Sequence, residues 1–591
     1  MNILFIPIFV LIIFIFGYLY YAKFVWLRAF QGNATPAQNE ADYQNTSTAY
    51  IGAPGTEDGF SPHVSMAAHV AALTSVSTIG GVVMALIWGW IPAFLWLLAS
   101  AAIAGGVYGM GGLWLSLRHP GQGPEEIVAV TLGKSFAYSL QAFTIIISTL
   151  LAALMVWLAS QLLVLHPAIV VIGLILPILA YGLGKWWRTN QAGEIGVVYL
   201  FVLLPILVMV ITYWTSQFPI SFSGAINLDI GGDIQLSMAS GVFWAAIILG
   251  FANHAAYRPL KIHMRPRGFI TASLLALLVL VTLSGAVFNH PNITAQDFQT
   301  LAAGPGALPW IFVTITSGAI AGYHLLIING VTVKLGVGTK NVRYIGYGGA
   351  LAESTIAITV LMVIAAGFGT EKQWLTFYGD WQGIQDLPRL LELYINGFAR
   401  YAAGIGLETG FSKNLAALIL FAAATTTLEV MLRILKQNLD RIQSVKPTPL
   451  LKNESRRLWL GLGLVAVTSL IVIPGAKSIP FWPFLGLTDL ALAAILLVCL
   501  AVILTSMKRL GAYILALAGF VTLILILTGL NRVTQLWVLD WSWSGWFELV
   551  LVLILVLVPS LAIYKGGLFV RKSFLKPAQE TSETLTPPAD Q

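Results

Sequence analysis

A histidine and a glutamate lie inside two neighbouring apolar runs near the middle of the chain, and both side chains can exchange protons. The first run ends in Gly318-Ala-Ile-Ala-Gly-Tyr-His324, and the second run contains Glu353. Ionisable side chains inside a membrane-spanning helix are costly, and they mark solute or ion pathways by default. Histidine also titrates near neutral pH. We therefore predict that His324 and Glu353, together with Ser317 and Tyr323, bind the solute or the coupling ion.

Both ionisable residues also have a purely structural interpretation. His324 would then be hydrogen-bonded between helices for packing. Glu353 would be a permanent partner of Lys334 or Arg343, which lie in the short basic loop between the two runs. The residue types leave both interpretations open.

A second group of polar side chains interrupts the apolar run that is centred near residue 74. The group consists of one histidine and four hydroxyl side chains: His69, Thr74, Ser75, Ser77 and Thr78. Backbone N–H groups at the start of a half-helix favour a carboxylate, so this segment predicts a cradle for an anionic substrate group. The alternative is that the hydroxyl groups only join helices.

Two further groups lie near predicted helix ends. Asn253, His254 and Tyr257 would form a site related to the first by an inverted repeat, although a tyrosine is also a common anchor at a membrane interface. Glu429 and Arg433 are four residues apart, so on a helix they can pair directly. We predict that they form a structural ion pair or an inner gate.

The composition indicates a polytopic membrane protein. Of the 591 residues, 58% are hydrophobic and only 10% are charged, whereas soluble domains carry about 25% charged residues. The net charge of +7 comes from basic residues in short loops between apolar runs, which is the pattern of cytoplasmic loops and not of nucleic-acid binding. We see no phosphate-binding loop, metal-ligand spacing or catalytic triad. We therefore predict no enzyme, no cofactor and no metal site.

About fifteen apolar runs are long enough to span a membrane. The distribution of Lys and Arg between loops places the N-terminus outside and the C-terminus in the cytoplasm, in the inner (plasma) membrane. Met1–Tyr21 has no basic start and a long apolar core, so we interpret it as a first transmembrane helix and not as a signal peptide. The fold class expected is all-α, with about 15 transmembrane helices in a five-plus-five inverted-repeat transporter core plus accessory helices.

The second, seventh and ninth spans contain polar residues and glycines, so we predict that they are discontinuous. A broken first helix in each of two inverted repeats would place the repeats at 64–216 and 236–435. The remaining segments are an accessory helix at 1–22, a cytoplasmic loop at 23–63, an external amphipathic segment at 388–408, accessory helices at 457–566 and a disordered cytoplasmic tail at 577–591.

Several ordered motifs resemble the carbon starvation protein A (CstA) family of membrane transporters. The strongest match is Gly318–His324, followed by Gly330, Thr332 and Lys334, then Ile345-Gly-Tyr-Gly348 and Leu351-Ala-Glu353. Other matches are Thr35-Pro-Ala37, Trp88-Gly-Trp-Ile-Pro92, Pro266-Arg267, Thr426-Thr-Leu-Glu429 and Trp482-Pro-Phe-Leu-Gly486. The resemblance runs from Phe16 to about Ile503 and implies a transporter.

The chain departs from the family pattern at several polar positions. A family His-His pair reads Ala68-His69, a His-Asp pair reads Tyr108-Gly109, and an Asn-Gln pair reads Thr488-Asp489. The resemblance implies uptake of peptides, amino acids or pyruvate under carbon starvation, with protons as the expected coupling ion and sodium as an open alternative. A second hypothesis is a transporter-derived sensor or structural membrane protein. Partners expected are the solute, protons and membrane lipids, with no nucleic acid. The sequence leaves the oligomeric state open.

Overall fold

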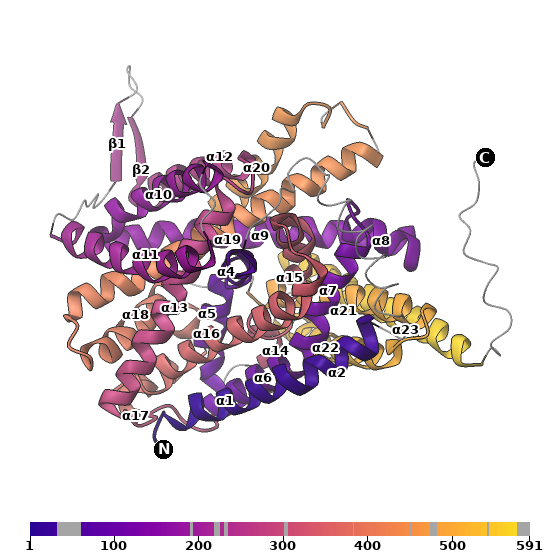
Figure 1. The fold of residues 1–591 in the computed structure, drawn as a ribbon, viewed down its shortest axis with the longest axis horizontal. Helices are drawn as coiled ribbons and strands as arrows, with labels where there is room; N and C mark the ends of the chain where they lie inside the picture. The colour runs from indigo at the N-terminus through magenta and orange to yellow at the C-terminus, as the bar shows by residue number, and fades with distance from the viewer. Residues whose placement is uncertain are drawn as a thin grey trace.

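The protein is an assembly of packed helices, consistent with the predicted all-α membrane class (Figure 1). The structure is a computed structural model, and it describes residues 1–31, 61–189, 193–217, 225–229, 235–300, 305–381, 383–445, 447–449, 451–472, 482–539 and 543–575. The predicted tail at 577–591 and most of the predicted loop at 23–63 lie outside these ranges.

The main helices are, in chain order, α1 (Phe5–Phe16), α2 (Ala22–Val25), α4 (Pro62–Leu73), α5 (Val76–Ala85), α6 (Trp90–Ala99), α7 (Gly105–Arg118), α8 (Pro124–Thr131), α9 (Lys134–Leu165), α10 (Val170–Thr189), α11 (Glu194–Thr215), α12 (Ser240–Tyr257), α13 (Met264–Asn289), α14 (Ala307–Thr314), α15 (Gly322–Ile327), α16 (Gly348–Ala365), α17 (Glu371–Tyr378), α18 (Leu387–Ala403), α19 (Thr409–Val445), α20 (Glu454–Val472), α21 (Trp482–Ser506), α22 (Gly511–Leu539) and α23 (Trp543–Leu575). A small antiparallel hairpin, β1 (Ala225–Asp229) and β2 (Gln235–Ala239), precedes α12 and was not expected.

Eleven helices of the described chain are long and apolar enough to cross a membrane. The bent pair Pro62–Leu73 and Ser77–Trp88, at 49° to each other, would be a twelfth span. The other three of the fifteen predicted runs correspond to α12, to the interrupted pair α14–α15 and to α20, whose first turn is charged. The count of fifteen is therefore not confirmed, although each run contains helix.

The first helix is longer than predicted. It runs from Phe5 to Gln31 through α1, α2 and two π-helical turns, so it includes Lys23 and Arg28. The prediction ended it at residue 22, because the two charges appeared to mark a loop. Lys and Arg can remain helical at a membrane boundary because their long apolar stems let the charged ends reach water.

Of the three spans predicted to be discontinuous, two are broken and one is continuous. The second span breaks between α4 and α5 at Thr74 and Ser75. The ninth span breaks between α14 and α15, where Gly318 has a φ of +81°. Glycine is favoured there because an L side chain is strained at such an angle. The predicted break in the seventh span is wrong, because α12 is continuous from Ser240 to Tyr257.

The broken spans lie in the middle of the assembly (Figure 1). Helix α13 packs along α4, α16 packs on α5, and α21 packs on α15. The long helices α9 and α19 pack against each other, and α22 and α23 pack on α21. Figure 1 shows α10, α11 and α12 on one side of the central helices and α23 on the other.

The predicted amphipathic segment at 388–408 corresponds to α18, which packs on α13, α16 and α19. His166, directly after α9, lies 3.0 Å from Glu392 of α18. This hydrogen bond lowers the pKa of the Glu392 carboxyl group. A lowered carboxyl pKa stabilises the fold above the ordinary pKa of the group, and this contribution is lost as the pH falls.

Two backbone segments of the core approach each other closely at Gly109 of α7. A Cβ atom at Gly109 would overlap the carbonyl oxygen of Gly346, next to α16. We expect Gly109→Ala to destabilise the protein by about 1–3 kcal/mol, because the backbone must move apart. The measurement is the melting temperature of the purified protein in detergent.

Gly519 provides the matched control, because it lies inside α22 and a Cβ atom there would meet no atom within 4 Å. Gly519→Ala should leave the melting temperature unchanged or raise it slightly, since alanine favours a helix more than glycine does. Equal melting temperatures for the two variants would contradict the close approach of α7 to Gly346.

Candidate functional site

Glu353 lies where the two broken spans meet. Its Oε1 atom accepts hydrogen bonds from the hydroxyl of Thr78 (3.1 Å) in α5, from the hydroxyl of Ser317 (2.9 Å) and from the backbone N–H of Gly318 (2.8 Å). The next residue, Ser354, donates to the carbonyl of Gly318. Helix α16 therefore binds the peptide groups on both sides of Gly318. The Glu353 carboxylate joins α16, α5 and the segment between α14 and α15.

Tyr323 forms a second junction between the broken spans. Its hydroxyl group lies 2.6 Å from that of Ser317 and 3.0 Å from that of Ser75, and it donates to the carbonyl of Leu73 (3.2 Å). Leu73 is the last residue of α4, so its carbonyl has no intrahelical partner. Ser77 lies close to Ser75 and 3.4 Å from Tyr323. Both breaks are thus stabilised by each other's side chains.

The two predicted histidines take different positions around this junction. His324 Nε2 lies 3.4 Å from Glu353 Oε1, and both side chains are buried. His69 is bonded through Nδ1 to the hydroxyl of Thr332 at 2.8 Å, while its Nε2 atom has no hydrogen-bond partner among the described residues. The Thr74 hydroxyl is also buried without a partner within that part of the chain. Ring nitrogens and hydroxyls left free in this way are available to a solute or an ion.

The structural alternative for Glu353 does not hold, since its partners are His324 and the donors at the break and not Lys334 or Arg343. The predicted group Thr74, Ser75, Ser77 and Thr78 lies against the predicted group Ser317, Tyr323, His324 and Glu353. Side chains that are 239 to 275 positions apart in the sequence thus form one buried polar cluster, which we call the crossing cluster.

A cavity adjoins the crossing cluster. It is a small, partly open pocket between α7, α8, α15 and α21, and its walls include Tyr108, Leu115, Leu325 and Leu496. The ring of Tyr108 lies 6.1 Å from that of His324. Tyr108, one wall of the cavity, therefore lies next to the crossing cluster.

The opposite end of the cavity is polar. Asn329 lines it and donates hydrogen bonds to Ser116 (3.3 Å) and to the carbonyl of Gln122 (3.1 Å). Arg441 of α19 contacts Asn329 at 3.4 Å and Glu125 of α8 at 3.0 Å. These contacts join α8, α19 and the segment after α15 next to the predicted cytoplasmic loop.

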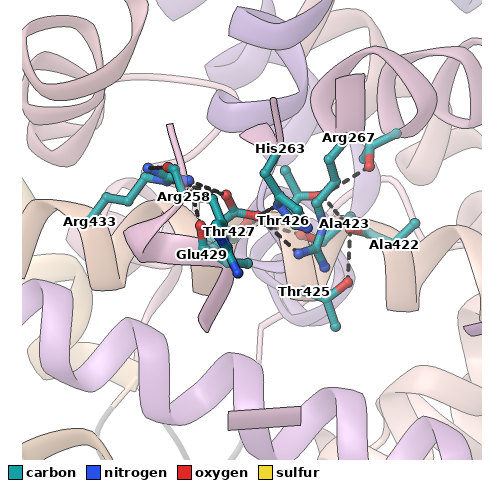
Figure 2. A network of polar contacts seen from close by, with 12 residues as sticks. Arg258, His263, Arg267, Ala422, Ala423, Thr425, Thr426, Thr427, Glu429 and Arg433 are labelled. Atoms are coloured by element: carbon teal, nitrogen blue, oxygen red, sulfur yellow. Dashed lines mark hydrogen bonds and ion pairs between the residues drawn. The ribbon is translucent and has the colours of Figure 1, made fainter. Parts of the chain in front are cut away.

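The predicted ion pair between Glu429 and Arg433 is confirmed, at 2.8 Å, and it belongs to a larger network (Figure 2). Glu429 is completely buried and also contacts His263 at 2.9 Å and Arg267 at 3.0 Å. Arg433 donates further to the carbonyls of Ala255 and Arg258, at the end of α12. Figure 2 shows Arg267 and Arg433 approaching Glu429 from opposite sides. Glu429 thus joins α13 to α19, and Arg433 extends the network to the end of α12.

Asn253, His254 and Tyr257 do not form the predicted mirror-related site. His254 accepts a hydrogen bond from Arg258 one turn later, at 3.0–3.2 Å. The ring of Tyr257 lies 4.4 Å from the ammonium group of Lys436. Because α12 is unbroken, it presents side chains and no free backbone groups, and it packs on α9 and α19.

Asp489 was not among the residues predicted for the site, yet its side chain is only 2% exposed. It lies seven residues into α21, or about 10 Å by helical rise. The rule that identified Glu353, a carboxylate inside an apolar run, would have identified Asp489 too. Arg267, which the sequence analysis named only in the Pro266-Arg267 motif, is buried in the first turn of α13.

The fold and the site define a polytopic helical membrane protein whose two broken spans enclose buried ionisable groups. No group of three or more His, Cys, Asp or Glu side chains in the described ranges is placed to hold a metal ion. The family described as carbon starvation protein CstA matches residues 2–375. The chain therefore belongs to the CstA family, as the motifs around His324 and Glu353 predicted.

Curated relatives carry the names of transporters. The chain is 26% identical over 368 residues to "Peptide transporter CstA" of Mycobacterium tuberculosis, which is 60% of this chain and 45% of the relative. It is 28% identical over 302 residues to "Pyruvate/proton symporter BtsT" of Escherichia coli K12, which is 50% of this chain and 40% of the relative. The match thus takes in less than half of each relative's own length.

A solved structure, of MhsT in complex with L-phenylalanine, aligns with 86% of this chain and 98% of its own. The sequence identity is 14% and the TM-score is 0.47.

Proposed function

We propose that the protein is a secondary active transporter that moves a small carboxylate-bearing solute, such as a peptide, an amino acid or pyruvate, with a proton gradient as the driving force. The observation that carries the proposal is the junction at Glu353, where donors from both broken spans converge on one buried carboxylate. Broken helices that meet around a buried site are the feature from which alternating access is built. The names of the relatives support the same class.

The proposal also identifies the two groups of helices that would move against each other. Since α12 is unbroken, we place the start of the two repeats at the broken pairs α4–α5 and α14–α15, and not at 64 and 236. Helix α13 packs on α4 as α21 packs on α15, and α9 pairs with α19, as related halves would. Rocking of one group of helices against the other would expose the crossing cluster to each side in turn.

In this arrangement the crossing cluster is closed. Glu353, Ser317, Thr78 and Tyr323 are all at most 2% exposed. The cavity beside Tyr108 would be the route toward the cytoplasm, and the contacts of Arg441 with Glu125 and Asn329 would form its inner closure. The N-terminus would lie outside and the C-terminus in the cytoplasm.

Uptake into reconstituted vesicles tests the function. Labelled pyruvate, alanine and dialanine are offered with an imposed pH gradient, acidic outside, and in separate vesicles with a sodium gradient. We expect accumulation of at least one probe with the pH gradient, and its loss when a protonophore collapses that gradient. Vesicles without protein are the control. Absence of accumulation under both gradients would instead favour the sensor or structural role.

A further inference from the structure

Asp489 contacts α15 from α21, a helix outside the predicted transporter core. Its Oδ1 atom accepts the backbone N–H of Tyr323 at 2.8 Å. Its Oδ2 atom is buried and has no hydrogen-bond partner among the residues that the structure describes. Helix α21 comes this close because residue 322 is glycine, and a Cβ atom there would lie 2.6 Å from the backbone nitrogen of Ala493.

Two more buried polar atoms close to Asp489 lack hydrogen-bond partners within the described part of the chain. They are the hydroxyl of Tyr108, from α7, and Nε2 of His324, from α15, which makes only the 3.4 Å ion-pair contact with Glu353. The Tyr108 and His324 rings are 6.1 Å apart, and Asp489 acts electrostatically on both Tyr108 and His324. Buried polar atoms from three helices that lack hydrogen bonds, next to the cavity that Tyr108 lines, indicate a ligand position and not a finished packing contact.

The charges facing this position are unbalanced. Tyr323, Tyr108 and His324 are the titratable groups that face Asp489, and only His324 is basic. The Thr316 side chain and the backbone N–H of Gly322 also donate hydrogen bonds to the Asp489 carboxylate, but they carry no charge. His324 lies beside Glu353 as well, so two buried carboxylates share one imidazole. A buried carboxylate requires a positive partner, because an isolated buried charge is strongly unfavourable.

We propose that Asp489 binds the positively charged nitrogen of the transported solute. This inference rests on the proposed transport function and narrows its substrate class to zwitterions with a free ammonium group, namely amino acids or peptides, over simple carboxylates. An Asn-Gln pair stands in the resembling family pattern where this chain has Thr488-Asp489. An amide lacks the negative charge, so the preference would be a property of this chain.

Equilibrium binding to the detergent-solubilised full chain tests the inference without transport. The probes are alanine, N-acetylalanine and pyruvate, each competing with labelled alanine. N-acetylalanine keeps the carboxylate and the methyl group but loses the positive charge. We expect N-acetylalanine and pyruvate to bind at least about tenfold more weakly than alanine, since each leaves a buried carboxylate unpaired.

Asp489→Asn keeps the shape of the side chain and removes its charge, so it should reduce the preference for alanine over N-acetylalanine to within about threefold. Asp380→Asn is the control, because Asp380 is exposed and accepts a hydrogen bond from the nearby N–H of Gly383. It should keep the full preference.

Equal binding of alanine and N-acetylalanine by the unaltered protein would overturn the inference, as would an unchanged preference in Asp489→Asn. The comparison of ligands on the unaltered protein decides the question even if that variant does not fold. Binding with the predicted preference but no accumulation in vesicles would instead contradict the transport function.

Discussion

Glu353→Gln is expected to abolish gradient-driven accumulation of the solute while the protein stays folded and still exchanges solute. The glutamine side chain keeps an oxygen that accepts from Gly318, Ser317 and Thr78, so the junction between the broken spans is retained. The amide cannot take up and release a proton. Accumulation should therefore fall at least about tenfold, the factor that corresponds to ~1.4 kcal/mol.

The measurement compares accumulation under a pH gradient with exchange of labelled for unlabelled solute at equal pH. Glu371→Gln is the matched control, since Glu371 is exposed at the start of α17 and accepts only from Gln296 among the described side chains. Glu371→Gln should leave both the accumulation and the exchange of solute unchanged. Accumulation by Glu353→Gln at the level of the control would remove Glu353 from the coupling mechanism.

Glu429→Gln is expected to lower the stability of the protein more than any surface charge change. Glu429 is the carboxylate shared by His263, Arg267 and Arg433, and it is completely buried. Without it, two buried guanidinium groups lose their counter-charge. Breaking a buried pair in this way costs about 3–5 kcal/mol. The melting temperature in detergent and the yield of folded protein should both fall clearly.

The control for this variant is Glu454→Gln. Glu454 also pairs with a cation, Lys436, at 2.6 Å, but 61% of its side chain is exposed. Exposed pairs contribute about 0–1 kcal/mol, so this change should have little effect. Adding Arg433→Gln to Glu429→Gln should restore part of the lost stability, because one unpaired charge is removed with its partner. Equal melting temperatures for the two single variants would show that the network does not stabilise the fold.

The interpretation of 316–353 from sequence was largely correct. Glycines at 318 and 322 and polar groups inside apolar runs predicted a broken span, and this span is broken. His324 and Glu353 were predicted as site residues on neighbouring runs, and the structure places them 3.4 Å apart. The same reasoning predicted that the second span is discontinuous, and the structure places its break at Thr74 and Ser75. Buried polar groups are so costly in a membrane that their presence in a sequence is informative without coordinates.

The prediction for α12 was wrong because polar residues near a helix end have two causes. Asn253, His254 and Tyr257 resembled a broken helix, yet they lie at an intact helix end, where His254 contacts Arg258 and Tyr257 contacts Lys436. Hydropathy does not distinguish a break at the membrane midplane from a polar helix end. One of the two contacts, that of Tyr257 with Lys436, involves a residue of α19, which lies far along the chain.

The sequence by itself determined the class of the protein, the family, most of the helices and the positions of two broken spans, because each depends on local composition and spacing. Only the tertiary structure decided that Thr78, Ser317 and Glu353 meet. The same holds for the hydrogen bond between Asp489 of α21 and Tyr323, and for the pairing of Glu429 with two arginines. Apart from the Glu429–Arg433 pair within α19, these contacts join residues 36 to 275 positions apart. Which helix faces turn toward each other depends on packing across the whole assembly, and no local pattern records that choice.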